Sequence, residues 1–492
     1  MTKRPTTLSR LAWAVAAGLA VAVAATGLSG CLKMGPDWTG PPQVVSVPAA
    51  FQHVGQGDSA FKPRDRWWES FGDPEINRLV AAALKYNLDI KEAAARVLEV
   101  GALFTQARSQ RFPSLGLEGK ATRSKSPESA SPVPGVSLDT GPSNNYNLTL
   151  AASFELDLWG RLARADEAAK ADLLAARENQ RTVIQTVVAS VVSTYLTMEA
   201  TERRLQMAES ALAAYRQSLA VVRGRYQRGL SSALAVRQAN RALAVAHALI
   251  PSLRLELGKL QQDLAVLVGS YPKTSPARRH PTDYFHRPDP VPPGLPSQLL
   301  LRRPDVRAAV ASLRALNARV GQAKAARFPT IRLTANWGAA SGELSDLFSP
   351  ASELWSLATG ISAPIFNAGR LAAGQRAAEA RRQKGAAAYA KKVLRAFAEV
   401  EGALLTRQER MAQRDLVAKA LVEARATLEE AQSRYLRGLA DYTTVLDAQK
   451  VRYQVEQDLI LNELAVLTNR VTLHRVLGGG WDRSLVPAAA NK

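Results

Sequence analysis

A strict alternation of apolar and polar residues marks one segment of the chain. In NYNLTLAASFELDL, residues 145–158, every second residue is apolar, and the residues between are mostly polar. The apolar positions are Tyr146, Leu148, Leu150, Ala152, Phe154, Leu156 and Leu158. A period of two predicts a β-strand with one apolar face. The strand is long for a soluble protein but suits a tilted membrane crossing, which needs about 9–11 residues.

Three further strands follow from similar alternation. The preceding SLGLEGKA places Leu115 and Leu117 on one face, which predicts a β-hairpin over about 114–158. The corresponding apolar positions in the second half are Ile331, Leu333, Ala335, Trp337, Trp355, Leu357, Ile361 and Ile365. They predict a second hairpin over about 330–366.

Each predicted hairpin leads into a long helical segment. Residues 161–228 and 370–437 contain no proline and keep a helical pattern. Each would be about 100 Å long if continuous, at ~1.5 Å per residue. Shorter helices are expected over about 233–268 and 441–477, and Pro74 marks the start of the first helix before the hairpins.

The chain repeats itself. RYQRGL at 225–230 returns as RYLRGL at 434–439, which is 209 positions further on. We expect a first structural repeat over 74–300, which ends in a Pro-rich connector, and a second over 301–478. An extended segment, 31–73, precedes the repeats, and a tail, 479–492, follows them.

The first thirty residues have the order of a secretory signal peptide. A basic leader precedes an Ala-rich apolar run, which ends in Leu28-Ser29-Gly30-Cys31. This ending resembles a bacterial lipobox, so we expect cleavage after residue 30 and a covalent lipid on Cys31, the only cysteine of the chain. The alternative is an ordinary cleavage site beside a chance cysteine. Leu32 follows Cys31, as in lipoproteins that are sorted to the outer membrane.

Composition and charge narrow the function. The formal net charge is +21, but the basic residues are spread through helical patterns and form no stripe with aromatic residues, so we expect no nucleic-acid partner. The five histidines are scattered and have no metal-ligand spacing. No catalytic constellation is visible. We therefore expect neither an enzyme nor a metal or cofactor other than the lipid.

Four strands per chain cannot close a barrel, and open sheet edges are not tolerated in hydrocarbon. Three copies would supply twelve strands, an even number that bacterial barrels permit. The fold class that follows is an internally duplicated α+β membrane protein, in which a trimeric twelve-stranded barrel continues into a long helical tunnel. A soluble sandwich edge and an antiparallel coiled-coil stalk remain the alternatives.

Four passages together resemble one known family. They are LSGCLKMGPDW, WWESFGDPEINRLVAAALKYNLDIKEAAARV, FELDLWGRLARA, and the duplicated RYxRGL motif whose second copy ends in DYTTVLDAQ. They are similar to the TolC-like outer-membrane factor family in its lipoprotein (NodT-type) branch. The resemblance covers nearly the whole chain after residue 30.

The resemblance implies a homotrimeric duct in the bacterial outer membrane that extends into the periplasm. Its partners would be a periplasmic adaptor protein and an inner-membrane pump of the resistance-nodulation-division type. The duct would carry small toxic compounds or drugs. Two alternatives stay open: the duct of a type I protein secretion system, and a non-conducting lipid-anchored stalk or adhesin.

In that family the hairpins after the long helices form a periplasmic tip that narrows the tunnel. The predicted adaptor contacts are Gly229, Leu230, Ser231, Gly438, Leu439 and Ala440. Asp447 matches the family's acid near the constriction, whereas its counterpart in the first copy is Gln238. We expect Asp447, with Asp441, Thr444 and Arg437, to form the gate. The alternative is that Asp447 only faces a neighbouring helix.

Overall fold

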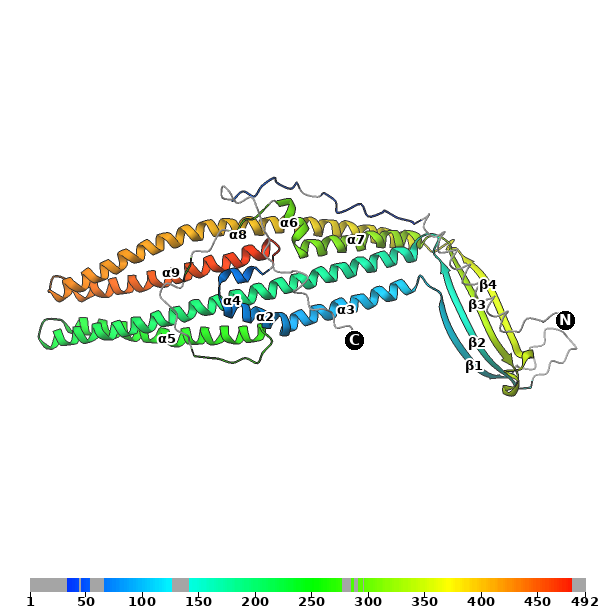
Figure 1. Ribbon diagram of the computed structural model, residues 1–492, viewed down its shortest axis with the longest axis horizontal. Helices are drawn as coiled ribbons and strands as arrows, with labels where there is room; N and C mark the ends of the chain where they lie inside the picture. Colours follow the sequence, from blue (N-terminus) through cyan, green and yellow to red (C-terminus); the bar gives the residue numbers. More distant parts are fainter. Residues whose placement is uncertain are drawn as a thin grey trace. The chain divides into compact units, whose positions relative to one another are not determined.

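The computed structural model describes residues 33–43, 46–53, 66–125, 141–276, 285–286, 291–294 and 296–479. The helices are η1 (Trp67–Phe71), α2 (Pro74–Tyr86), α3 (Leu88–Ser109), α4 (Arg161–Gln227), α5 (Ala233–Leu267), α6 (Pro296–Arg302), α7 (Pro304–Ala325), η3 (Leu344–Asp346), η4 (Pro350–Ser352), α8 (Arg370–Leu436) and α9 (Tyr442–Val476). The strands are β1 (Ser114–Ser124), β2 (Ser143–Leu156), β3 (Thr330–Ser341) and β4 (Glu353–Ser362). Figure 1 shows two pairs of long helices and one sheet. The predicted signal peptide and Cys31 lie outside the described residues, as does nearly all of the predicted C-terminal tail.

The sheet has the order β1-β2-β3-β4, and all its strands are antiparallel. One row of the register runs Leu117, Leu150, Trp337 and Trp355 across the four strands. Directly paired residues share a face, so the apolar residues of all four strands lie on one side. The alternation in the sequence therefore predicted the face that each side chain takes.

The apolar face of the sheet is exposed within one chain. Leu117 is 71% exposed, and Trp355 and Leu357 are each 75% exposed. Within the described residues β1 and β4 pair on one side only. A large apolar surface with two open edges is not a stable arrangement in water, so both features call for partners.

The chain divides into two compact units, and each contains parts of both repeats. The first comprises residues up to Pro42, Glu99–Ala175 and Val310–Tyr389, and it includes the sheet. The second comprises Gln43–Leu98, Ala176–Ala309 and the chain from Ala390 onward. The repeats expected from sequence therefore do not coincide with the compact units, because the long helices α4 and α8 belong to both.

The second unit contains the largest apolar core. Trp67 is 1% exposed, Val80 and Val188 are completely buried, and all three belong to one cluster. The Trp67 indole stacks on the His474 ring, with 5.1 Å between the ring centroids. Tyr195 donates a hydrogen bond of 2.8 Å to Asp73, which also caps the start of α2. The core thus fixes η1 and α2 against α4 and α9.

The duplication is kept in the lengths of the helices. α4 and α8 each have 67 residues, and α5 and α9 each have 35. The long helices start at the residues that the sequence predicts and end one residue earlier. α4 contains an 18-residue window apolar enough to cross a membrane, but 67% of that window is buried, as in a core helix.

Candidate functional site at the helix hairpins

The loops α4–α5 and α8–α9 have the same backbone. Gly229 and Gly438 have φ of 74° and 79°, in the left-handed region. Leu230 N donates to Arg225 O at 2.9 Å, and Leu439 N repeats this bond to Arg434 O at 2.8 Å. Together with the glycine bonds to the residues three positions earlier, this is a Schellman-type helix end. Both long helices therefore end at a glycine in the left-handed conformation.

The two loops differ where the next helix starts. In the first copy the Ser232 hydroxyl accepts a hydrogen bond of 3.2 Å from Ala235 N and caps α5. In the second copy Asp441 occupies the equivalent position before α9, but its side chain makes no capping bond. Asp441 is exposed, so its carboxylate is open to solvent.

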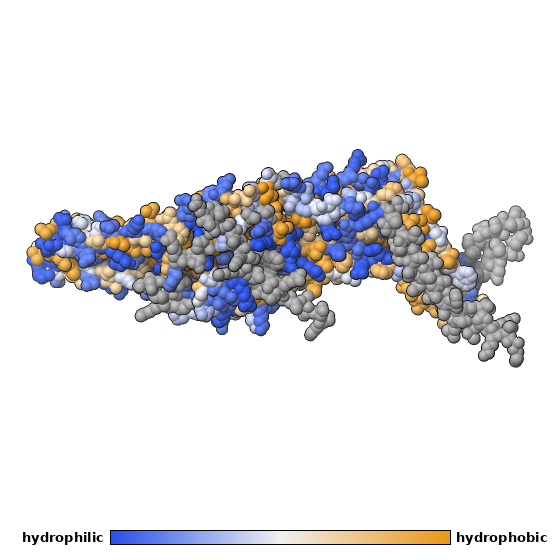
Figure 2. All heavy atoms as spheres, turned by 45° about the horizontal axis from the view of Figure 1, so that its top comes forward, coloured by the Kyte–Doolittle hydropathy of each residue, from blue (hydrophilic) through white to orange (hydrophobic). Residues whose placement is uncertain are grey.

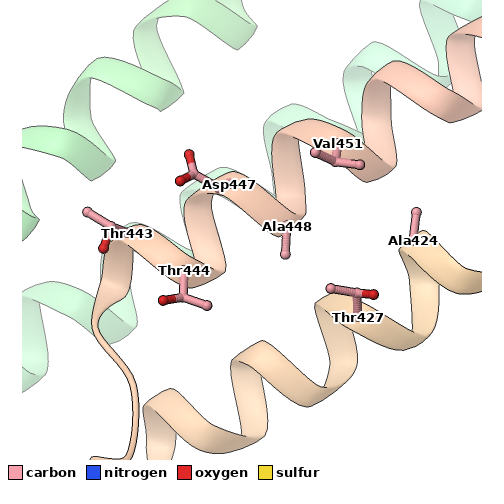
Figure 3. A pocket seen from close by; sticks show the side chains of 7 residues that line it. All are labelled: Ala424, Thr427, Thr443, Thr444, Asp447, Ala448 and Val451. Carbon is pink, nitrogen blue, oxygen red and sulfur yellow. The ribbon is translucent and has the colours of Figure 1, made fainter.

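Asp447 lies in the second turn of α9, and its side chain is 72% exposed. With Thr443, Thr444, Ala448 and Val451 of α9 it lines an open depression of about 410 Å³, which Ala424 and Thr427 of α8 complete. In Figure 3, Thr444 and Ala448 point toward α8, whereas Asp447 points away from it. Its carboxylate makes an ion pair of 3.4 Å with Lys450.

Arg437 does not contact the acids with which it was grouped. Its guanidinium donates to the Ser433 hydroxyl at 2.8 Å, so it lies back along its own helix. The basic neighbour of Asp447 in the described part of the chain is Lys450. Within one chain, therefore, Asp441, Asp447 and Arg437 do not form one cluster.

A contact between the two hairpins was not foreseen from the sequence. Arg225 of the first copy donates to Leu436 O at 3.0 Å. Its guanidinium carbon lies 4.9 Å from the centroid of the Tyr435 ring. The Ser231 hydroxyl is 3.5 Å from the Tyr435 hydroxyl, and Tyr435 is 7% exposed. We call Arg225, Ser231, Tyr435 and Leu436 the hairpin contact.

Three more tyrosines join the hairpins further along the helices. Tyr442 is 4% exposed, and its hydroxyl lies 3.2 Å from the Ser218 hydroxyl. Tyr215 packs against Tyr453, with 5.6 Å between ring centroids. Burial, reinforced by the neighbouring tyrosines, raises the pKa of Tyr215 to about 12. Burial also raises the pKa of Tyr442 and of Tyr453, so the hydroxyls of these three tyrosines stay neutral at ordinary pH.

The predicted adaptor-contact residues lie at exposed hairpin ends. Leu230 and Leu439 are 60% and 64% exposed, and Leu436 is 58% exposed. In Figure 2 hydrophobic and hydrophilic residues are mixed at this end of the helices. These three leucine side chains are not packed into a core, so the loops expose apolar side chains to solvent. Within the described residues no group of three His, Cys, Asp or Glu side chains is placed to hold a metal ion.

The comparison with known proteins agrees with this architecture. The model of the outer membrane efflux protein family matches residues 79–270 and 295–479. The chain is 36% identical to the solvent efflux pump outer membrane protein SrpC of Pseudomonas putida, over 93% of this chain and 97% of that one. It is 34% identical to the cation efflux system protein CusC of Escherichia coli, over 93% and 98% of the two chains.

A solved structure gives the same fold. The structure of the outer-membrane channel OprN superposes with a TM-score of 0.84, at 29% identity, over 91% of this chain and 99% of that one. The predicted fold class and the predicted outer-membrane efflux function are thereby confirmed. The chain belongs to the outer membrane efflux protein family and acts as the outer-membrane channel component of an efflux system.

Proposed function

We propose that three copies of this chain close one twelve-stranded barrel and form a passive exit duct for small toxic compounds. The observation that carries this proposal is the sheet, which has one continuous apolar face and two unpaired edges within the described residues. Pairing β4 of one chain with β1 of the next removes both edges, and lipid then covers the apolar face. The relatives that export solvents and cations support small molecules as the cargo.

Mass measurement and conductance test the duct together. In mild detergent the purified protein should have the mass of three chains, and in planar bilayers it should give single-channel currents. A monomer mass would contradict the trimer. A trimer that gives no current would contradict the duct and favour a stalk.

In this proposal a lipid on Cys31 anchors the duct in the membrane. The lipobox at residues 28–31 supports this part of the proposal. The intact mass of the protein, compared with that of Cys31→Ser, measures the lipid directly. A periplasmic adaptor and an inner-membrane pump of the resistance-nodulation-division type complete the system, and the exposed Leu230 and Leu439 loops would meet the adaptor.

Asp447 forms the gate in this proposal, with Thr444 beside it and Asp441 at the start of the helix. Threefold symmetry would bring three exposed Asp447 carboxylates toward one axis, where they repel each other and attract cations. Asp447→Ala should therefore lower cation selectivity and raise the resting conductance. Gln238→Ala, at the equivalent position of the first copy, is the matched control. Unchanged selectivity in Asp447→Ala would show that the carboxylate only faces a neighbouring helix.

A further inference from the structure

Arg164, at the start of α4, is a charged residue that the duct does not explain. Its side chain is completely buried, although it lies at the start of the helix. Its guanidinium donates to Met34 O at 3.0 Å, to Gly35 O at 3.3 Å and to Asp37 at 2.8 Å. A fourth bond of 2.9 Å goes to Glu167. Most of its partners therefore belong to residues 33–37, which we call the anchor segment.

Other groups of the first unit bind the same segment. Lys33 makes an ion pair of 2.7 Å with Glu167, and Met34 N donates to Trp159 O at 3.0 Å. Burial alone would raise the pKa of Glu167, but the hydrogen bonds from Lys33 and Arg164 outweigh it and lower that pKa. The carboxylate thus stays charged, and it links the anchor segment to the helix.

Glycines let the anchor segment come this close. Gly35 has φ of 91°, and a Cβ built on it would lie 2.3 Å from the Gly321 Cα of α7. A Cβ built on Gly321 would lie 2.7 Å from both Met34 O and Arg164 Nε. Asn317, one turn earlier on α7, donates to Pro36 O at 2.9 Å. The segment therefore fills a groove that side chains would block.

A buried guanidinium is costly unless hydrogen bonds satisfy its donors. Here two main-chain carbonyls of the anchor segment, those of Met34 and Gly35, accept hydrogen bonds from the guanidinium. Asp37 is 82% exposed, so its carboxylate contributes less. Removing the segment would take away three of the four hydrogen bonds of the Arg164 guanidinium. Arg164 and the segment consequently stabilise each other.

We infer that Arg164 is a positioning residue that holds the lipid anchor at the junction between β2 and α4. Cys31 precedes Lys33 by two residues, and two residues of chain can reach about 7 Å at most. If the anchor segment were released, the next buried side chain among the described residues would be Phe51. A flexible tether from Cys31 to Phe51 has a mean span of about 25 Å. The dock therefore keeps the acylated residue near the junction between β2 and α4. This inference rests on the proposed lipid at Cys31.

Trypsin offers a direct measure of the dock. Cleavage after Lys33 releases the lipidated tripeptide that starts at Cys31, and mass spectrometry of the remaining chain records the loss. The bound Met34 amide should protect this bond in the wild-type protein. We expect Arg164→Ala and Gly321→Ala to raise the release rate about tenfold or more, because each frees the segment without touching the cleaved bond. Gly374→Ala, on α8 with nothing within 4 Å of the new Cβ, should leave the rate unchanged.

Assembly tests the positioning role itself. The fraction of SDS-resistant oligomer in unheated membranes should fall in Gly321→Ala, which keeps every charge, and in Arg164→Ala. Equal release rates in all variants would overturn the dock. Faster release with a wild-type oligomer fraction would overturn the positioning role. A wild-type protein without lipid would contradict the proposed anchor instead, and cleavage after Lys33 would still report the dock.

A second inference comes from the hairpin contact and the repeat offset. Arg225 of the first copy covers Tyr435 of the second within one chain. The reverse contact would join Arg434 of the second copy, the equivalent of Arg225, to Tyr226 of the first copy, the equivalent of Tyr435. Both residues are exposed, Tyr226 by 49%. A contact that runs from the first copy to the second is head-to-tail, and such contacts continue around a ring.

We propose that Arg434 of one chain lies over Tyr226 of the neighbouring chain and donates to the Gln227 carbonyl there. This rests on the proposed trimer. The hydroxyl contact between Ser231 and Tyr435 has no counterpart between chains, because Ala440 occupies the position equivalent to Ser231. The seam between chains therefore has fewer hydroxyl contacts than the hairpin contact within a chain.

Paired cysteines distinguish the two seams. With a short bifunctional thiol reagent, Arg434→Cys with Tyr226→Cys should link chains into dimers and trimers on denaturing gels. Arg225→Cys with Tyr435→Cys, the matched pair, should react without any increase in mass beyond the reagent. Trimers by mass with no chain-to-chain link in the first pair would overturn the seam. A monomer mass would instead contradict the proposed trimer.

Discussion

The two copies of the Arg-Tyr motif have the same backbone and opposite surroundings. In the first copy Arg225 reaches the partner hairpin and Tyr226 is 49% exposed. In the second copy Tyr435 is 7% exposed and Arg434 points to solvent. The same pair of residues thus supplies a cation on one side of the contact and an aromatic ring on the other.

The difference shows what duplication can and cannot fix. The loop geometry depends on local rules, the left-handed glycine and the helix end, so it is identical in both copies. Burial depends on the neighbour, and each hairpin has the other on one side only. Adjacent residues on a helix point about 100° apart, so a neighbour that covers Arg225 leaves Tyr226 outside.

The largest expected effect is the loss of the buried ring. Tyr435→Ala should lower the free energy of unfolding by about 3–5 kcal/mol, because it opens a cavity between the hairpins. Tyr226→Ala removes only the cation–π contact that we propose with Arg434 of the neighbouring chain, and should cost about 0.5–1 kcal/mol. Denaturant unfolding of the purified protein measures both. Equal effects would mean that the two tyrosines have equivalent surroundings.

The second largest effect on the free energy of unfolding is expected from loss of the Arg225 guanidinium. Arg225→Ala leaves Leu436 O without its donor and uncovers the Tyr435 ring, so we expect a loss of about 1–3 kcal/mol. Among the described residues the Arg228 guanidinium, three residues on, bonds to Gly224 O of its own helix, and Arg228→Ala should change stability by no more than about 0.5 kcal/mol. The same unfolding midpoints test the pair. A large effect of Arg228→Ala would contradict the assignment of the contact to Arg225.

Local rules explain how much of the fold the sequence predicted. The strands and their apolar face follow from a period of two, and the helix ends follow from Gly229 and Gly438. The hairpin contact was missed because Arg225 and Leu436 are 211 positions apart, and no local period relates them. The anchor segment was read only as an extended segment, since the burial of Arg164 depends on Gly321 of a distant helix.

At the candidate gate the sequence identified a residue but not its contacts. Sequence identified Asp447 by its resemblance to a family acid, but it could not choose the basic neighbour. The structure places Lys450 beside Asp447, and it turns Arg437 back onto Ser433. Side-chain direction on an exposed helix end is decided by single hydrogen bonds, which leave no pattern in the sequence. The role of Asp447 in gating stays a prediction.

The loop glycines should behave alike in both copies. Gly229→Ala and Gly438→Ala each place a side chain at positive φ with nothing within 4 Å, so the cost is backbone strain of about 1–2 kcal/mol. Gly402 lies inside α8, also with nothing within 4 Å, and Gly402→Ala should stabilise by about 0.5–1 kcal/mol. Thermal unfolding of the variants measures both the expected loss of stability at the loop glycines and the expected gain at Gly402. Different costs at Gly229 and Gly438 would show that the loops are not equivalent.

The smallest effect at neutral pH belongs to Tyr215, whose equivalent in the second copy is Ala424. Burial raises the pKa of Tyr215 to about 12, above the value near 10 of an unfolded tyrosine. The stability that depends on its neutral form is therefore complete below about pH 10 and is lost as the pH rises toward about 12. Tyr215→Phe keeps the ring against Tyr453 and should leave stability nearly unchanged at pH 7, while it reduces the loss between these two pH values. Unfolding midpoints measured from pH 8 to pH 12 would contradict this account if the wild-type and Tyr215→Phe curves stayed parallel.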